Sequence, residues 1–263
     1  MSSPLPAVLA FSASDPTGGA GIQADVLTIA SLGCHPLSVL TALTAQDTRG
    51  VEALVAVEPA WITRQARAVL DDIPVAAFKL GVLGSARNAE AVAAILAKHP
   101  RVPVVLDPVL ASGRGDALSD SETVQALRSV LLPLATVLTP NSLEARRLAL
   151  AAPGAGLADC ARALTELGCK YVLVTGTHEP GARVVNTLYG AGGLLREDRW
   201  PRLAGEYHGS GCTLASAIAA FLARGLAMED AVTEAQAYTW KTLEAGFQPG
   251  RGQHLPNRFF DAP

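Results

Sequence analysis

The chain has 263 residues, 49% of them hydrophobic, which is enough for one large α/β domain with a well-buried sheet. Its net charge of −3, with acidic and basic residues interspersed, gives no electrostatic basis for binding nucleic acid or an anionic membrane. The first residues lack the basic and apolar runs of a signal peptide, and no stretch reaches the roughly 20 apolar residues that span a bilayer. The four cysteines are scattered without metal spacing, which is typical of reduced thiols. We therefore expect a cytoplasmic protein whose partner is a small molecule.

Short apolar runs alternate with alanine- and leucine-rich segments along most of the chain. Strands are predicted at residues 7–12, 36–43, 53–57, 75–80, 102–106, 136–138 and 171–174. Helices are predicted at residues 21–32, from Pro59 onwards, and at 88–98, 124–131, 158–167, 213–226 and 229–245. Residues 183–200 predict a β-hairpin, because glycines separate two strand-like runs there. Uninterrupted apolar strands between helices indicate a mostly parallel sheet with helices on both faces, in a single three-layer α/β/α domain over residues 1–263.

Ligands of such sheets bind beyond the carboxyl ends of the strands, so the loops after the strands are the candidate site. The first of them, residues 12–25, places Gly18, Gly19 and Gly21 within four residues. Glycines there permit a positive φ and the close approach of a ligand. The loop has neither the Walker pattern nor a complete GxGxxG, so a plain turn before a helix is the alternative interpretation.

Two further loops carry a polar side chain at a predicted strand end. The Gln46 amide donates and accepts together, which matches the edge of an aminopyrimidine, although an ordinary surface glutamine explains it as well. Asp107 follows an apolar strand directly. Its carboxylate is either a functional group or a simple capping or turn residue.

The fourth loop contains Asn141 and, three residues later, Glu144. This spacing is typical of a capping box, in which the two side chains bond to the first turn of a helix. The alternative is that both side chains order magnesium-bound waters beside phosphates. The sequence around this loop leaves both interpretations open.

The fifth loop gives the sharpest prediction. Gly209 and Gly211 precede a helix of small residues, so backbone N–H groups can converge at its N-terminus and bind a transferring phosphoryl group. We expect the same helix end to favour the thiolate of Cys212. The alternative is a structural one, with small residues for close packing and an inert thiol.

Together these loops resemble the hydroxymethylpyrimidine/phosphomethylpyrimidine kinases of thiamine biosynthesis, within the ribokinase-like superfamily. The matching motifs, which occur in the same order along the chain as in the family, are SDPTGGAGIQAD (14–25), TALTAQ (41–46), KLGVL (79–83), DPV (107–109), TPN (139–141) with Glu144, and GSGCT (209–213). The resemblance covers residues 8–245. It implies a ribokinase-like fold, ATP as phosphoryl donor and Mg²⁺ as the divalent cation. We also expect a homodimer.

The family's functional positions can be carried over residue by residue. The resemblance implies that the substrate ring contacts Gly21, Asp25, Gln46, Val82 and Val109. It assigns the nucleotide side to Asp107, Asn141 and Thr175, and the metal to Glu144. The anion hole would consist of Gly209, Ser210, Gly211 and Cys212, with Cys212 at the position of the superfamily's usual aspartate base.

The chain departs from the family pattern at several of these positions. Ala13 stands where a glycine is usual, and Val82 where methionine is frequent. Thr175 stands where many members have lysine, which removes a cation and leaves threonine to contact phosphates or ribose. The tail also differs and offers only Arg251 and Arg258 as substitutes, so we expect a weak second phosphorylation, that of the monophosphate.

Two alternatives remain beside the pyrimidine kinase. A pyridoxal kinase acts on a similar ring with a hydroxymethyl group, and the amide of Gln46 can also face a pyridine nitrogen. A non-catalytic protein that captures a pyrimidine or a B6 vitamer is the second. The glycine-rich anion hole, Asn141 and Glu144 argue against it, because a mere binding protein does not need to hold phosphates.

Overall fold

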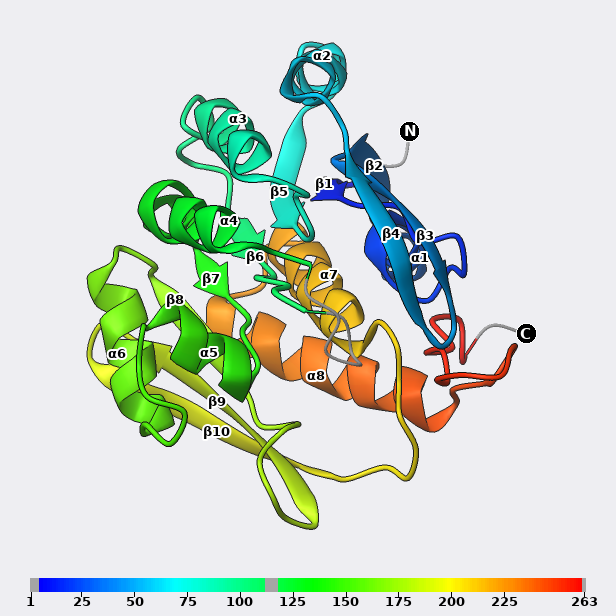
Figure 1. The fold of residues 1–263 in the computed structure, drawn as a ribbon, viewed down its shortest axis with the longest axis vertical. Coiled ribbons are helices and arrows are strands. Elements are labelled where there is room, and N and C mark those ends of the chain that lie inside the picture. The colour runs from blue at the N-terminus through cyan, green and yellow to red at the C-terminus, as the bar shows by residue number, and fades with distance from the viewer. Residues whose placement is uncertain (1–4, 112–117, 262–263) are drawn as a thin grey trace.

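The uninterrupted apolar runs form the interior strands of an eight-stranded sheet, in a computed structural model that describes residues 5–111 and 118–261 (Figure 1). Every residue of β1 (Ala7–Ser12) is buried, as expected for a strand covered on both faces. β9 runs antiparallel to both of its neighbours, and the other pairs are parallel. In spatial order the strands are β10 (Gly193–Pro201), β9 (Arg183–Gly190), β8 (Tyr171–Thr175), β7 (Val137–Leu138), β6 (Val104–Leu106), β5 (Val75–Leu80), β1 and β2 (His35–Leu40).

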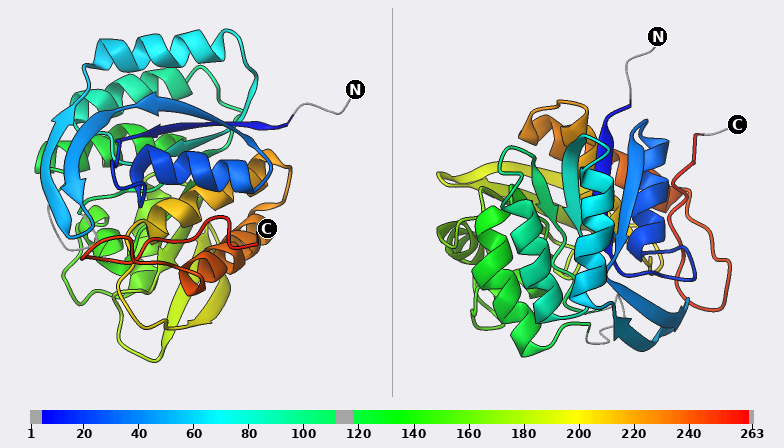
Figure 2. Two further views of the ribbon diagram at one scale, coloured as in Figure 1. Left: turned by 90° about the vertical axis from the view of Figure 1, so that its right-hand side faces the viewer. Right: turned by 90° about the horizontal axis from the view of Figure 1, so that it is seen from above.

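Helices cover both faces of this sheet (Figure 2). Alternate residues of β1 point to opposite faces, so Leu9 and Phe11 join one core while Val8 and Ala10 join the other. The first core contains α2 (Pro59–Leu70), α3 (Ala86–Leu96), α4 (Ser121–Ala126), α5 (Ser142–Leu148) and α6 (Leu157–Glu166). The second contains α1 (Gly21–Ser31), α7 (Ser210–Ala223) and α8 (Met228–Glu244). The predicted three-layer α/β/α architecture is confirmed.

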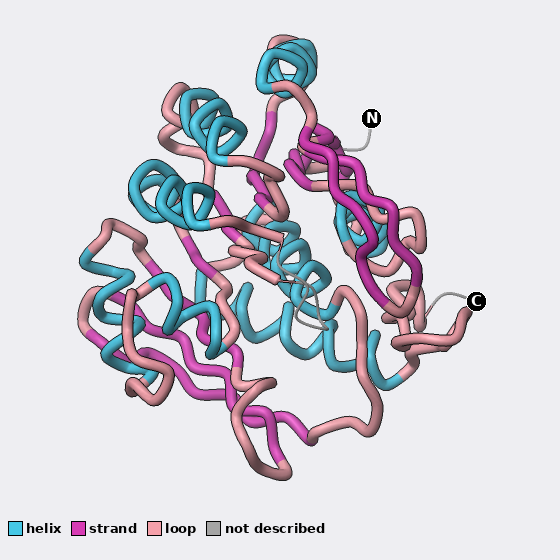
Figure 3. The backbone as a smooth tube through the Cα atoms, in the orientation of Figure 1, coloured by secondary structure: helices cyan, strands magenta, loops and turns pink. Residues whose placement is uncertain are grey.

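A second, two-stranded sheet was not predicted. The apolar run at residues 36–43 divides, since β2 ends at Leu40 and β3 (Ala42–Asp47) pairs with β4 (Gly50–Ala56) as a separate hairpin (Figure 3). The buried Thr41 lies at the break, where its hydroxyl donates to the carbonyl of Val82. Because Leu43 and Val55 lie exposed on the outer face of the hairpin, its apolar pattern resembles that of a core strand.

The helix predicted at residues 124–131 begins earlier and changes geometry along its length. α4 continues into a π-helical turn, Leu127–Leu131, and then a 3₁₀ turn, Leu132–Leu134. The hairpin predicted at residues 183–200 is β9 and β10. None of the described helices has the length and apolar character needed to cross a membrane.

Candidate active site

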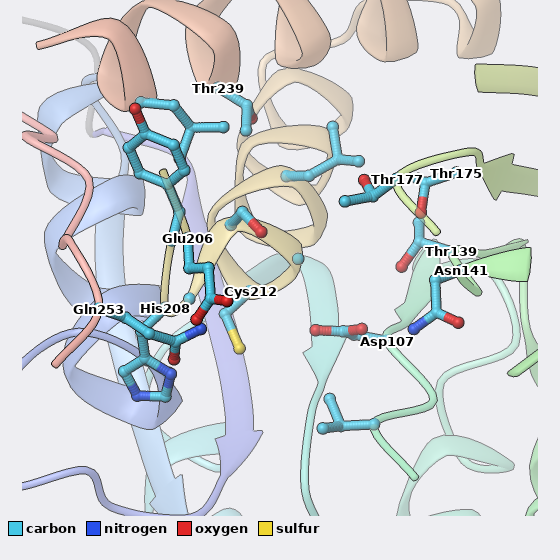
Figure 4. A pocket seen from close by; sticks show the side chains of 18 of the residues that line it. Asp107, Thr139, Asn141, Thr175, Thr177, Glu206, His208, Cys212, Thr239 and Gln253 are labelled. Atoms are coloured by element: carbon cyan, nitrogen blue, oxygen red, sulfur yellow. The ribbon is translucent and has the colours of Figure 1, made fainter. Parts of the chain in front are cut away.

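A cavity of about 560 Å³ lies beyond the carboxyl ends of the parallel strands, where the sheet geometry predicts it. Figure 4 shows the start of α7 on one side of this cavity and the loops after β6, β7 and β8 on the other. All the predicted site residues except Asp25 line it: Gly21, Gln46, Val82, Asp107, Val109, Asn141, Glu144, Thr175, Gly209, Ser210, Gly211 and Cys212. The fold therefore brings five loops that are distant in sequence to one place.

The carboxylate of Asp15 organises the glycine-rich loop. It accepts hydrogen bonds from the backbone N–H groups of Thr17 at 2.8 Å and Ala20 at 2.7 Å, and its Oδ2 lies 2.8 Å from His208 Nε2. Burial raises the pKa of Asp15, but these hydrogen bonds outweigh it and hold the pKa at about 2. Gly21 ends the loop with φ +60°, and an added Cβ would lie 2.4 Å from the carbonyl oxygen of Ala13. Only glycine fits there.

The anion hole is predicted at the start of α7. Gly209 precedes the helix with φ +82°, and a Cβ at this position would lie 1.8 Å from the carbonyl oxygen of Gly19. The glycine is required because the two loops are in backbone contact. The next N–H groups, of Ser210, Gly211 and Cys212, belong to the first turn of the helix, where such groups have no partner within the helix. They lie at the positive end of the helix dipole and line the cavity.

Cys212 is the partly exposed cysteine of this first turn, and Figure 4 shows its thiol facing Asp107. Burial raises the pKa of the thiol to about 12; the charge of Lys79 opposes this, while the carboxylates of Asp107 and Asp25 add to it. The prediction that the helix end favours a thiolate is wrong. Desolvation and two carboxylates outweigh the helix end, so the thiol is protonated at neutral pH.

Asp107 follows β6, and its side chain lies next to the thiol of Cys212. Burial raises the pKa of its carboxyl group to about 6, although Lys79 and the Cys212 thiol lower it. The side chain is therefore mostly ionised at neutral pH, and its Oδ2 has no hydrogen-bond partner among the described residues. At neutral pH the carboxylate of Asp107, rather than the protonated thiol of Cys212, is the group able to accept a proton.

Asn141 and Glu144 form the capping box that their spacing predicts. Asn141 Oδ1 accepts from the N–H groups of Leu143 and Glu144 at 2.9 Å each, and Glu144 Oε2 accepts from the N–H of Asn141 at 3.0 Å. Burial and the nearby charge of Asp107 raise the pKa of Glu144 to about 8, against the hydrogen bonds it accepts. The capping role is thus present, and it places two carboxylates of like charge together in the cavity.

Asp25 does not line the cavity, contrary to its predicted place beside Gln46. Its side chain is fully buried, where Oδ1 lies 2.7 Å from Lys79 Nζ and accepts from the Ser216 hydroxyl at 2.7 Å. Lys79 is likewise 0% exposed. Because desolvation requires partners for buried charges, the two form an ion pair beneath the start of α7. Asp25 therefore belongs to the interior of the fold rather than to the cavity lining.

Gln46 lies on the cavity face of the β3–β4 hairpin. It shares that face with Thr44, while Leu43 and Ala45 are exposed on the other. The register of the hairpin shifts between Ala45 and Gln46, and such an irregularity redirects a side chain. The hairpin thus forms one wall of the cavity.

Several lining residues were missed by the sequence reasoning. His208 lines the cavity and bonds to Asp15, and its position next to Gly209 was the available signal. Gln236, on α8, accepts from Trp200 Nε1 at 3.1 Å and from Asn186 Nδ2 at 2.9 Å. The rule of strand carboxyl ends could not find Asn186, Trp200 and Gln236, because they come from the antiparallel hairpin and α8.

Comparison with known proteins identifies the family. The sequence profile named phosphomethylpyrimidine kinase matches residues 15–257. The chain belongs to the phosphomethylpyrimidine kinase family. The hydroxymethylpyrimidine/phosphomethylpyrimidine kinase of Streptomyces coelicolor is 42% identical over 94% of this chain and 92% of its own. The thiamine biosynthesis bifunctional protein ThiED of Geobacter sulfurreducens is 40% identical over 98% of this chain, which spans only 53% of that longer relative.

A solved structure extends the comparison to the fold of this phosphomethylpyrimidine kinase family member. The pyridoxal kinase of Bacillus subtilis, determined as an ADP complex, has a TM-score of 0.88 and 28% identity, with 97% of each chain covered. The predicted ribokinase-like α/β fold is therefore confirmed.

Proposed function

We propose that this kinase transfers the γ-phosphoryl group of ATP to the hydroxymethyl group of 4-amino-5-hydroxymethyl-2-methylpyrimidine, a step of thiamine biosynthesis. The observation that carries the proposal is one cavity that holds an amide for a ring edge, a helix N-terminus for a phosphoryl group and two carboxylates. The family and the 42% identity to a hydroxymethylpyrimidine/phosphomethylpyrimidine kinase support the same substrate class.

The proposed substrate position follows from the walls of the cavity. The ring lies between Val82 and Val109, with its amino edge toward the amide of Gln46, and the hydroxymethyl group points to the start of α7. The amides of Gly211 and Cys212 stabilise the charge of the transferred group. The substrate hydroxyl gives up its proton to the Cys212–Asp107 pair, in which Asp107 has the lower pKa. Transfer is direct, and no covalent phosphocysteine is required.

The nucleotide and its metal are assigned to the opposite side. Thr175 and Asn141 line that side, which supports contacts to the phosphates. Mg²⁺ binds through one or two carboxylates and several waters, and Glu144 fits this because its carboxyl group lines the cavity next to the charge of Asp107. When bound, the cation would neutralise the charge that develops on the phosphate oxygens.

We expect Glu144→Gln to raise the magnesium concentration for half-maximal turnover by ~10-fold and to lower turnover, since it removes one charged ligand. The carboxyl group with its pKa of about 8 must lose a proton to bind the cation, so the wild-type requirement falls as pH rises from about 6 to 8. In Glu144→Gln the magnesium requirement should not change with pH over this range, because glutamine does not ionise. Steady-state kinetics against free magnesium measures both effects, and unfolding temperature accounts for the weakened cap. Normal turnover at low magnesium would leave Glu144 as a capping residue only.

We expect Gln46→Leu to raise the KM for hydroxymethylpyrimidine by ~30-fold or more, because the polar edge of the ring would lose its buried partner. The KM for ATP should stay within twofold, since the nucleotide binds on the other side of the cavity. Gln125→Leu, on the exposed face of α4, is a matched control. An unchanged substrate KM would remove Gln46 from the substrate site.

A pyridoxal kinase is the second candidate, favoured by the TM-score of 0.88 to the Bacillus subtilis pyridoxal kinase. Competition between hydroxymethylpyrimidine and pyridoxal in one ATP-dependent assay separates the two functions. The proposal predicts a higher kcat/KM for the pyrimidine. A higher value for pyridoxal would replace the proposed substrate.

We expect the second phosphorylation, of the monophosphate, to be at least ~10-fold slower than the first. An additional phosphate beside those of ATP requires cations. Thr175 offers none, and Arg258 is 4% exposed and bonded to backbone carbonyls, which removes one of the two tail arginines as a substitute. Time-resolved separation of mono- and diphosphate measures the ratio. Equal rates would show that another cation, such as Arg202 of the cavity wall, supplies the charge.

The homodimer and the cytoplasmic location predicted from the sequence stay predictions. Sedimentation velocity of the purified chain measures the first.

A further inference from the structure

A buried arginine of the C-terminal segment, residues 247–258, lies against the glycine-rich loop. The segment runs beside the tip of the β3–β4 hairpin, at the right of Figure 1, where the N–H of Gln253 donates to the carbonyl of Thr48 at 2.8 Å. It then passes the loop before α7, since the N–H of His208 donates to the carbonyl of His254 at 2.9 Å. The segment ends at Arg258, whose side chain is buried.

The guanidinium of Arg258 connects the two backbone segments that meet at the anion hole. Its Nη1 and Nη2 donate to the carbonyls of Gly18 and Gly19, and its Nε donates to the Thr213 hydroxyl at 3.2 Å. The Thr213 hydroxyl in turn donates to the carbonyl of Gly209 at 2.8 Å. Since the carbonyl of Gly19 also packs against Gly209, one side chain holds the glycine-rich loop and the first turn of α7 together.

The charge of Arg258 is unusual for its position. No carboxylate among the described residues lies within ion-pair distance of it, and all three of its contacts are neutral oxygens. Burial lowers its pKa, while the neighbouring acidic groups, Cys212 first among them, raise it. Arginine stays protonated in proteins, so a positive charge remains behind the N-terminus of α7. It adds to the positive end of the helix dipole.

We propose that Arg258 is a positioning residue for phosphoryl transfer, which fixes the N–H groups at the start of α7 by holding Gly18, Gly19 and Thr213 in one arrangement. Arg258 is absent from the lining of the cavity, so it acts through the backbone. The inference rests on the proposed kinase function. Misplaced donors weaken stabilisation of the transition state more than binding of either substrate. Substitution of Arg258 should therefore lower kcat rather than raise KM.

The test compares Arg258→Met, Arg258→Lys and the control Arg251→Met, an exposed arginine of the same segment, in steady-state kinetics and amide hydrogen exchange. For Arg258→Met we expect kcat to fall ~10²-fold, by analogy with loss of one oxyanion donor, with both KM values within threefold. Exchange at residues 15–21 and 209–213 should become faster. Arg258→Lys keeps the charge without the fork of donors, so it should recover only part of kcat. Arg251→Met should match the wild type.

Each outcome decides the inference. A kcat within threefold of the wild type for Arg258→Met, or unchanged exchange at the start of α7, would overturn it. If the methionine variant does not fold, Arg258→Lys replaces it, and a wild-type kcat with unchanged exchange in that variant would overturn the requirement for a guanidinium. Absence of turnover in the wild type would instead reject the proposed function, while hydrogen exchange would still test the connection between the two loops.

Discussion

Replacing Cys212 with alanine is expected to reduce turnover by roughly 10² to 10⁴-fold, the contribution of a positioned acid–base group, while both substrates still bind. A hydroxymethyl group is a poor nucleophile, and its proton must leave as the phosphoryl group arrives. The thiol and Asp107 both line the cavity, with a pKa of about 12 for the thiol against about 6 for the carboxyl group. Loss of the thiol therefore interrupts the path of the proton to Asp107, the group of the pair that is ionised at neutral pH.

Three measurements examine this expectation. Cys212→Asp should retain part of the turnover, because a carboxylate replaces the lost acid–base group. Ionised Asp107 is required, so kcat/KM should rise as pH increases through about 6 and then level off, and Asp107→Asn should abolish this rise. A thiol-alkylating reagent should inactivate the enzyme slowly at neutral pH, where the thiol is protonated, and faster as the pH rises. Substrate should protect the enzyme, since the other three cysteines are buried. Near-normal turnover by Cys212→Ala would contradict the assignment and leave the helix N-terminus as the principal catalytic group.

The second large effect concerns stability. Lys79→Met is expected to lower the free energy of unfolding by about 3–5 kcal/mol, because it leaves the buried carboxylate of Asp25 without its partner at 2.7 Å. Denaturant unfolding measures the change. The double variant Lys79→Met, Asp25→Leu removes both charges and should recover most of the loss. A decrease below about 1 kcal/mol for the single variant would show that groups other than Lys79 stabilise the buried charge of Asp25.

Much of the fold followed from local pattern. The buried strand β1 and the helices after it are visible as apolar runs and helical periodicity, and the alternation of the two predicts the layers. The β3–β4 hairpin could not be distinguished from a strand of the main sheet by its sequence. Its apolar residues include Leu43, which is exposed, so the hairpin sequence resembles that of a core strand. The break at Thr41 depends on a hydrogen bond to Val82, which is distant in sequence.

The site was predictable where one loop carries its own chemistry. Asp107 follows a strand and the Gly209–Cys212 turn begins a helix, and the parallel sheet brings them together. Gln46 lies within β3, and the separate hairpin brings it to the same cavity. Protonation states were not predictable in this way. The pKa of Cys212 depends on burial and on carboxylates from two other loops, and these outweigh the helix end that the sequence displays.

Residues that act across the fold were also missed. Asp25 is adjacent to the glycine-rich loop in sequence, yet Lys79 draws its side chain into the interior. His208 and Arg258 contact that same loop from nearly 200 residues or more away. No local spacing encodes these contacts, because they arise only when the loop before α7 and the C-terminal segment pack against the glycine-rich loop.

Transfer of labelled γ-phosphate from ATP to purified hydroxymethylpyrimidine, with magnesium and product identification by mass spectrometry, tests the central claim most directly. The account predicts a phosphate ester at the hydroxymethyl group, formed in equal amount with ADP, and its loss in Cys212→Ala. Label transferred to pyridoxal but not to the pyrimidine, or tight pyrimidine binding without any transfer, would contradict it.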